Sequence, residues 1–253
     1  MQRATLLVAM VVALTLGSVV PAQAITNGRP DGDAHPYVGL VTDFSSVCSG
    51  ALVSPTIFVT AAHCFETPGQ AVAVTVDPAS FNNEDVELVF GRWFPDPEFC
   101  IACAPGLVGF DTHDVAVVVL SEPIVVPRYA RLPSPGQVED VGRKQRLAVV
   151  GYGVQDFATG GGPPQAIAPF TRFFAPVELL RAGRPLADEF IKVTANPSQG
   201  KGGTCFGDSG GPVLLGDTIL AVNSFVTNGR CNGVTYSYRL DTPEAQAFVR
   251  GFL

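Results

Sequence analysis

Residues 207–212 read Gly-Asp-Ser-Gly-Gly-Pro, and this stretch guides the interpretation of the whole chain. The run places Ser209 in a tight turn between glycines. Because glycine lacks a side chain, the serine hydroxyl and the neighbouring backbone N–H groups can approach a substrate carbonyl closely. A Gly-x-Ser-x-Gly pattern also occurs by chance in loops, so its meaning depends on what precedes it.

Two further blocks lie upstream of the serine. Residues 60–64 read Thr-Ala-Ala-His-Cys, and residues 113–120 read His-Asp-Val-Ala-Val-Val-Val-Leu. A histidine, an aspartate that opens an apolar strand and the glycine-flanked serine therefore follow one another in that order. These blocks, together with the segment that begins at Ile25, resemble the chymotrypsin/trypsin family of secreted serine endopeptidases. The loops between the blocks resemble that family only weakly.

The nucleophile elbow of α/β-hydrolases shares the Gly-x-Ser-x-Gly pattern. In that class the chain order is serine, acid, histidine, so a histidine must follow the serine. Here every histidine precedes Ser209, at His35, His63 and His113. Chain order therefore excludes an esterase of that class.

Residues 1–24 have the pattern of a signal peptide. Arg3 supplies the positive end, residues 6–16 form the apolar stretch, and Ala-Gln-Ala at 22–24 is the cleavage site. The apolar stretch is too short for a stable membrane span, and no later stretch reaches about 18 uninterrupted apolar residues. We therefore expect a secreted protein, extracellular or periplasmic, whose residues 25–253 form a serine protease domain.

The chain is acidic, with 16 Lys and Arg residues against 23 Asp and Glu residues and a net charge of −7. Removing the leader takes away Arg3 and no acid, which makes the mature charge about −8. Such a surface disfavours nucleic acid and anionic membranes as partners, although it equally serves ordinary solubility. The resemblance implies protein or peptide substrates. We expect a monomer without a cofactor or a metal.

Short runs of β-branched and aromatic residues, separated by turn residues, dominate the mature sequence. The 27 glycines and 21 prolines fall mostly between these runs. The pattern predicts an all-β sandwich or barrel. The expected strands are 37–42, 51–60, 71–76, 86–90, 115–120, 146–151, 212–215 and 218–225.

The proline-rich stretch 127–142 is the best candidate for a linker between two halves. The resemblance implies two six-stranded antiparallel β-barrels with the active site between them and a short C-terminal helix. We accordingly expect an N-terminal barrel at 25–130, a C-terminal barrel at 131–241 and a helix at 242–253. Helical spacing supports the last of these, because one face carries apolar residues at Ala245, Phe248, Val249 and Phe252.

The resemblance also implies roles for individual residues. Ser209 would be the nucleophile, which needs a base within hydrogen-bond reach, and His63 would be that base because its pKa lies near neutrality. Asp114 would hold His63 in the correct tautomer and stabilise the imidazolium, as in the general scheme for this triad. The backbone N–H groups of Gly207 and Ser209 would form the oxyanion hole.

Other residues compete for these roles. His113 adjoins Asp114, but neighbours in an extended segment point to opposite faces, which is poor geometry for a catalytic pair. We therefore favour His63, in its Ala-Ala-His-Cys context, and assign surface or structural roles to His113 and His35. The rival acids lie in polar loops, without an apolar strand to bury them, at Asp85, Asp96 and Asp111.

Cleavage after residue 24 would expose Ile25-Thr26-Asn27-Gly28, which resembles the mature N-terminus of the family. The resemblance implies that the new ammonium inserts and pairs with Asp208. A buried carboxylate is costly without a partner, so burial of Asp208 fits the arrival of a cation. No propeptide separates the leader from Ile25, so signal cleavage itself would create the active form.

The position six residues before Ser209 is Gly203, where trypsin-like members carry an aspartate that binds Lys or Arg. Its replacement by glycine argues against cleavage after basic residues. Val226 would narrow the mouth of the pocket where many relatives have glycine. We expect a shallow, uncharged pocket for small or medium apolar residues, with preference for large apolar residues as the nearest alternative. The expected pocket residues are Gly203, Thr204, Ser224, Phe225, Val226 and Thr235.

Six cysteines in an exported chain point to disulfides. The resemblance suggests pairing of Cys48 with Cys64 and of Cys205 with Cys231, which leaves Cys100 and Cys103 as a local bridge. A zinc site that uses Cys100, Cys103 and His113 is the alternative, but it lacks a fourth ligand.

Two other functional classes compete with an active endopeptidase. One is a catalytically inactive homologue that serves as a binding module, which usually shows a substitution in the triad or the glycine frame. No such substitution is visible in this sequence. The other is a structural secreted β-protein, which the ordered motifs make improbable.

Overall fold

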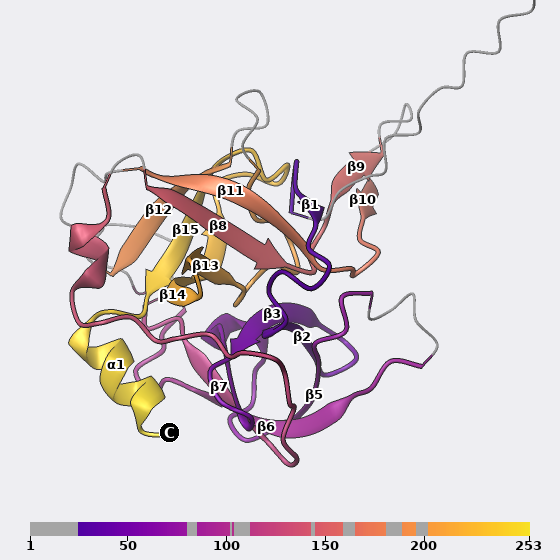
Figure 1. The fold of residues 1–253 in the computed structure, drawn as a ribbon, viewed down its shortest axis with the longest axis vertical. Helices are drawn as coiled ribbons and strands as arrows, with labels where there is room; N and C mark the ends of the chain where they lie inside the picture. Colours follow the sequence, from indigo (N-terminus) through magenta and orange to yellow (C-terminus); the bar gives the residue numbers. More distant parts are fainter. Residues whose placement is uncertain are drawn as a thin grey trace, which may run out of the picture.

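The computed structural model describes residues 25–79, 85–101, 103, 112–142, 145–158, 165–180, 189–195 and 202–253. Figure 1 shows two β-structures stacked on each other, with the chain running from the indigo and magenta one into the orange and yellow one. The expected signal peptide lies outside the described residues, as does Asp111, one of the three rival acids.

The first β-structure is a closed six-stranded barrel in the order β2-β3-β4-β7-β6-β5, with all pairs antiparallel. The sequence predicted one strand over 51–60, which was wrong, because this run ends in one strand, turns at 53–56 and begins the next. The strands are β2 (Val38–Thr42), β3 (Val47–Leu52), β4 (Ile57–Thr60), β5 (Ala71–Thr75), β6 (Val89–Pro95) and β7 (Ala116–Leu120).

The second β-structure closes through pairing of β8 (Arg146–Gly151) with β11 (Phe173–Leu180). Its order is β11-β12-β15-β14-β13-β8, so it too is a six-stranded barrel, to which β1 (Arg29–Pro30) adds an edge. A hairpin of β9 (Asp156–Ala158) and β10 (Gln165–Ile167) projects beside it (Figure 1). The remaining strands are β12 (Phe190–Ala195), β13 (Pro212–Leu215), β14 (Thr218–Val226) and β15 (Gly233–Arg239).

The chain ends in helix α1 (Pro243–Arg250). Thr242 caps it by accepting a hydrogen bond from the N–H of Ala245, and Pro243 stands where a missing N–H costs nothing. Ala245 and Val249 are buried on one face. The two barrels and the C-terminal helix confirm the expected fold class. Within the described residues, no helix has the length and apolar character needed to cross a membrane.

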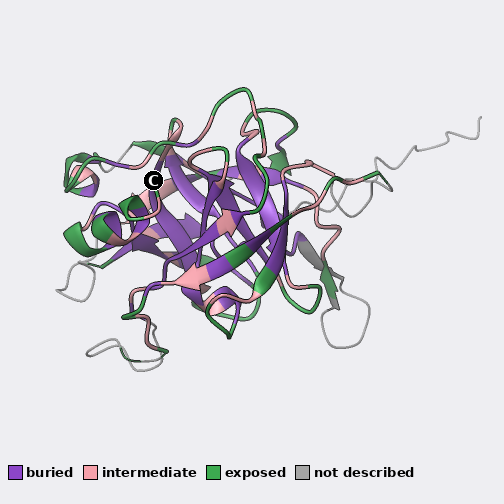
Figure 2. Ribbon diagram, turned by 90° about the horizontal axis from the view of Figure 1, so that it is seen from below, coloured by how far each residue is buried: buried purple, intermediate pink, exposed green. Residues whose placement is uncertain are grey.

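Burial follows the strands, as Figure 2 shows in purple, while loops and the outer face of α1 are exposed. Apolar side chains fill the interior of each barrel, and some strands, such as β2 and β4, are buried at every position. The junction of the barrels is different, because it holds a buried charge.

Arg172, just before β11, supplies that charge at the junction and is only 2% exposed. Its Nε donates to a carboxylate oxygen of Asp31 at 2.9 Å, and its Nη1 donates to the carbonyls of Val38 and Val76 at 2.8 Å each. Asp31 also pairs with His35 at 2.5 Å. A buried charge is tolerated when it is paired and fully hydrogen-bonded, so this cluster ties the N-terminal segment to both barrels.

Candidate active site

The His63 and Asp114 side chains meet at one end of the first barrel. His63 lies in a 3-10 helix (Ala62–Cys64) directly after β4, and Asp114 precedes β7, the strand paired with β4. The Nδ1 atom of His63 is 2.8 Å from Oδ2 of Asp114, and the His63 backbone N–H donates to Oδ1 at 3.0 Å. Two separate bonds therefore fix both the ring and its backbone against one carboxylate.

Asp114 is fully buried, and Ser224 Oγ of the second barrel donates a short hydrogen bond to its Oδ2. Burial by itself would raise the pKa of Asp114, but the charge of His63 and the hydrogen bonds from His63 and Ser224 outweigh it and hold the pKa below its usual value. The carboxylate thus stays ionised at neutral pH and favours the protonated form of His63.

Ser209 lies in the tight turn before β13. Gly207 and Gly210 on either side have φ values of +93° and +76°, which side chains other than glycine rarely adopt. A Cβ on Gly210 would collide with Thr60 Oγ1 and the Ser49 carbonyl. Both glycines are therefore required by this turn and by its close contact with the first barrel.

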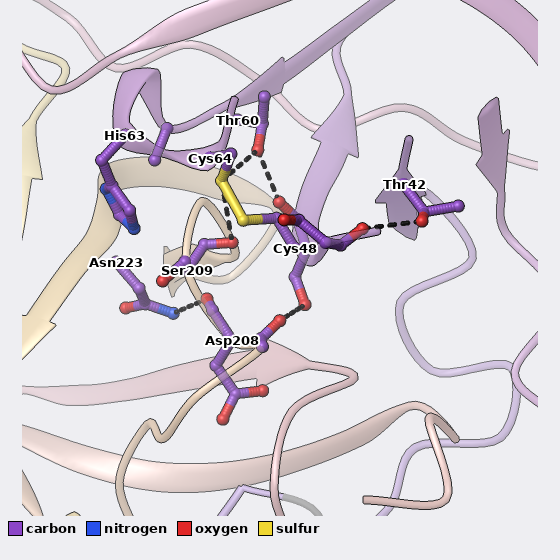
Figure 3. The surroundings of a disulfide bond; sticks show 12 residues. Thr42, Cys48, Thr60, His63, Cys64, Asp208, Ser209 and Asn223 are labelled. Atoms are coloured by element: carbon purple, nitrogen blue, oxygen red, sulfur yellow. Dashed lines mark hydrogen bonds between the residues drawn. A yellow bond between two sulfur atoms is a disulfide. The ribbon is translucent and has the colours of Figure 1, made fainter. Parts of the chain in front are cut away.

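The histidine and the serine face one cavity of about 320 Å³. In Figure 3 the imidazole of His63 and the side chain of Ser209 point into the same space, while the carboxylate of Asp208 points away from Ser209. The lining residues come from both barrels and are His63, Thr204, Cys205, Phe206, Ser209, Asn223, Ser224, Phe225 and Val226. Among the described residues, no acceptor is bonded to the N–H of Gly207 or of Ser209.

Asp208 directly precedes Ser209 in the loop of residues 205–211, which we call the serine loop. Its side chain is fully buried. Its carboxylate accepts hydrogen bonds from the N–H groups of Gly153 and Cys205 at 2.8 Å each. Burial raises its pKa to about 7, because those two bonds offset only part of the cost of removing the charge from water. The carboxyl group is consequently poised to gain from a nearby cation.

Ile25 is fully buried within the core of the second barrel. The next residue, Thr26, pairs with Gly203, whose N–H donates to the Thr26 carbonyl at 3.1 Å. Thr26 Oγ1 in turn donates to the Gly203 carbonyl at 3.2 Å. The segment that starts at Ile25 therefore lies against Gly203, shortly before Ser209 along the chain.

Four of the six expected pocket residues line the cavity, namely Thr204, Ser224, Phe225 and Val226. Thr235 is fully buried behind it and accepts a hydrogen bond from Thr204 Oγ1 at 3.0 Å. Gly203 also lies outside the lining, and a Cβ at this position would collide with the Cβ of Ala195 in β12.

Sequence reasoning did not single out Phe206 and Asn223, although both line the cavity. The sequence offered one signal for each, because Phe206 adjoins Gly207 and Asn223 adjoins Ser224, and both of these neighbours were expected at the site. The rival His113 is absent from the lining and lies 3.7 Å from Glu98 and against the ring of Tyr238. Of the other rivals, His35 pairs with Asp31. Asp96 is buried at the end of β6, and Asp85 does not line the cavity.

All six cysteines are paired, as Cys48–Cys64, Cys100–Cys103 and Cys205–Cys231. The first bridge joins β3 to the 3-10 helix that carries His63 (Figure 3). The third lies at the cavity, where Val226 packs against it. Two disulfides therefore brace the walls of the site.

Comparisons with known proteins fit this geometry. The sequence model of the trypsin family matches residues 25–245. Neutrophil elastase of Mus musculus is 23% identical over 241 residues, which cover 90% of this chain and 82% of that protein. Seminase of Drosophila melanogaster is 25% identical over 220 residues, which cover 82% and 72% of the two chains.

Among solved structures, neuropsin, a serine protease expressed in the limbic system of mouse brain, superimposes with a TM-score of 0.69. The match covers 90% of this chain and 99% of that chain at 17% identity. A likeness at that identity concerns the fold alone.

Proposed function

This chain belongs to the trypsin family of serine proteases, and we propose that it is an active endopeptidase in which Ser209, His63 and Asp114 form the catalytic triad. The observation that carries the proposal is the 2.8 Å contact between His63 Nδ1 and the buried Asp114 carboxylate, beside a cavity shared with Ser209.

In the proposed reaction His63 Nε2 accepts the proton of the Ser209 hydroxyl as Oγ attacks the scissile carbonyl carbon. The carbonyl oxygen becomes an anion, which the N–H groups of Gly207 and Ser209 stabilise. The imidazolium then protonates the leaving amine, and the C–N bond breaks to leave an acyl-enzyme. Water, deprotonated by the same histidine, releases the acid and restores the serine. Asp114 keeps the imidazole oriented throughout and stabilises its charged form.

For substrate preference we propose small or medium apolar side chains at the residue before the cleaved bond (P1), and not Lys or Arg. No acidic residue is present among the residues that line the described cavity. Val226 lines it together with Cys205, which is bridged to Cys231. One of the relatives, at 23% identity, is named an elastase, which is consistent with the proposed preference.

We further propose that residues 1–24 are removed on export and that the new ammonium of Ile25 pairs with Asp208. The burial of Ile25, the Thr26–Gly203 pairing and the raised pKa of Asp208 support this. Three disulfides fit an oxidising compartment outside the cytoplasm. Secretion, a monomeric state and the absence of membrane or nucleic-acid partners belong to the same proposal.

The test is turnover of the purified chain 25–253 on a peptide library varied at P1, with Ser209→Ala as control and a serine-directed fluorophosphonate as label. Cleavage after Ala or Val that is lost in Ser209→Ala supports both the mechanism and the pocket. Cleavage after Phe or Arg would keep the mechanism and reject the pocket. A folded chain with neither turnover nor label would be an inactive homologue.

The N-terminal proposal has its own test. A chain that retains one methionine before Ile25 should lose nearly all activity, because its ammonium is displaced from Asp208. Full activity in that chain would reject the pairing while leaving the triad in place.

A further inference from the structure

Ser49 in β3 is fully buried, and it lies where the first barrel touches the serine loop. Glycines enclose it closely. A Cβ added to Gly151 would lie 3.1 Å from Ser49 Oγ, and one added to Gly211 would lie 3.1 Å from Ser49 Cβ. The Ser49 side chain is therefore closely surrounded, and neither glycine could carry a side chain without crowding it.

Ser49 reaches the serine loop in two places. Its Oγ donates to the carbonyl of Gly207 at 2.9 Å and accepts from the N–H of Tyr152 at 2.9 Å, which uses the hydroxyl both as donor and as acceptor. Its backbone N–H donates to the carbonyl of Ser209 at 2.8 Å. The Ser49 carbonyl is itself held by Thr60 Oγ1 at 2.7 Å.

These bonds act on the peptide groups beside the proposed oxyanion donors. A peptide bond is planar, so holding a carbonyl oxygen fixes the orientation of the whole group. The Gly207 carbonyl lies between the N–H groups of Gly207 and Ser209 along the chain. Gly207 has a φ of +93° and no side chain, and glycine can rotate freely unless something restrains it.

We propose that Ser49 is a positioning residue for hydrolysis, and that its hydroxyl holds the Gly207 carbonyl so that the N–H groups of Gly207 and Ser209 aim into the cavity. The inference rests on the proposed function, because it assigns Ser49 to the stabilisation of the oxyanion. Ser49 contacts no substrate and acts only through the loop.

A matched control comes from β2, the strand paired with β3. Thr42 is 1% exposed, its Oγ1 donates to the Ser46 carbonyl at 2.7 Å, and it accepts from the N–H of Phe44 at 2.8 Å. The Thr42 hydroxyl thus donates to one carbonyl and accepts from one N–H, as the Ser49 hydroxyl does. Both of its partners lie within four residues of Thr42 and not in the serine loop. Figure 3 shows both the Thr42 bond and the loop around Ser209.

The experiment compares Ser49→Ala and Thr42→Val in the mature chain, with active sites counted by fluorophosphonate titration. We expect kcat of Ser49→Ala to fall roughly 10- to 100-fold with KM within about two-fold, because small misplacements in a site are costly. Affinity for a peptide boronic acid, which forms a tetrahedral adduct, should fall in parallel. Thr42→Val should keep kcat within about two-fold while losing similar thermal stability.

A kcat of Ser49→Ala within about three-fold of the parent, or equal losses in both variants, would overturn the inference. Ser49→Gly repeats the test if the alanine variant does not fold. Amide hydrogen exchange separates this inference from the proposed function, since it needs no turnover. Exchange at Asp208 and Gly211, whose N–H groups donate to the carbonyls of Cys205 and Asp208 within the loop, should accelerate at least about ten-fold in Ser49→Ala and not in Thr42→Val, and unchanged exchange would reject the positioning role.

Discussion

The pH dependence of stability should reveal whether the Ile25 ammonium reaches Asp208. The Asp208 carboxyl is fully buried, is bonded to two N–H groups, and has a pKa raised to about 7 from its ordinary value of 3.8. Burial is the cause of this increase, which the two hydrogen bonds offset only in part. A chain with one extra methionine before Ile25 should keep the carboxyl in this state, because its ammonium lies one residue away.

The magnitude follows from the two pKa values. Moving the pKa of Asp208 from 3.8 to about 7 is a shift of about 3 pH units, or about 4 kcal/mol at 1.36 kcal/mol per unit. Because the folded state binds the proton more tightly than the unfolded state, this stabilisation is fully present below about pH 4. It is lost as the pH rises to about 7. Pairing with the Ile25 ammonium would lower the pKa of Asp208 in the folded state. The free energy of unfolding would then no longer fall between pH 4 and pH 7 on account of this group.

The assay is denaturant unfolding between pH 4 and pH 7.5 of three chains, namely the mature chain, the methionine-extended chain and the extended chain with Asp208→Asn. Other titrating side chains are common to all three chains and cancel in the differences, and the α-amino group, with an ordinary pKa of about 8, stays mostly protonated over this range. The extended chain should lose about 4 kcal/mol relative to the mature chain over this range, and Asp208→Asn should abolish that difference. Equal pH profiles for the mature and extended chains would refute the reasoning.

Four further substitutions, two of them combined in a double variant, test the site and its support. Asp114→Asn should lower kcat by about 10⁴-fold with an unchanged circular dichroism spectrum, because the wrong tautomer of His63 is then favoured; a loss under ten-fold would exclude Asp114 from the triad. Val226→Gly should raise the ratio of kcat/KM for Phe over Ala substrates by about 10- to 200-fold, as deeper pockets do, and an unchanged ratio would place Val226 away from the pocket. Arg172→Met should cost about 3–5 kcal/mol in the free energy of unfolding, since the buried Asp31 carboxylate loses its permanently charged partner and keeps the contact with His35. Asp31→Asn should recover most of that loss in the double variant, as measured by urea unfolding.

Local sequence predicted the strands that consist of β-branched runs. The apolar run before residue 120 and the run at 146–151 became β7 and β8 within one residue of expectation. Strands β11, β12 and β15 were not predicted. In β11 Pro176 interrupts the run, and β15 alternates Ser and Thr with Tyr. These strands are fixed by their neighbours in the barrel rather than by their own propensity.

The site shows the same division between local and long-range information. The blocks around His63, Asp114 and Ser209 could be found because each is a short motif. Ser49 could not, because its bond to Gly207 spans 158 positions of the chain and no local pattern marks it. The pairing of Arg172 with Asp31 spans 141 positions and was missed for the same reason.

The proposed catalytic groups come from different barrels, so their alignment depends on the contacts that cross the junction. Those contacts include directional polar bonds, such as Ser224 Oγ to the Asp114 carboxylate and the Ser49 N–H to the Ser209 carbonyl. Apolar packing within each barrel supplies stability but is not directional, so it leaves small rotations between the barrels possible. A hydrogen bond weakens steeply with angle, and it therefore restrains such rotations. Loss of either of these two bonds should consequently raise the activation free energy of hydrolysis by more than it lowers the free energy of unfolding, whereas a cavity in either barrel core should do the reverse.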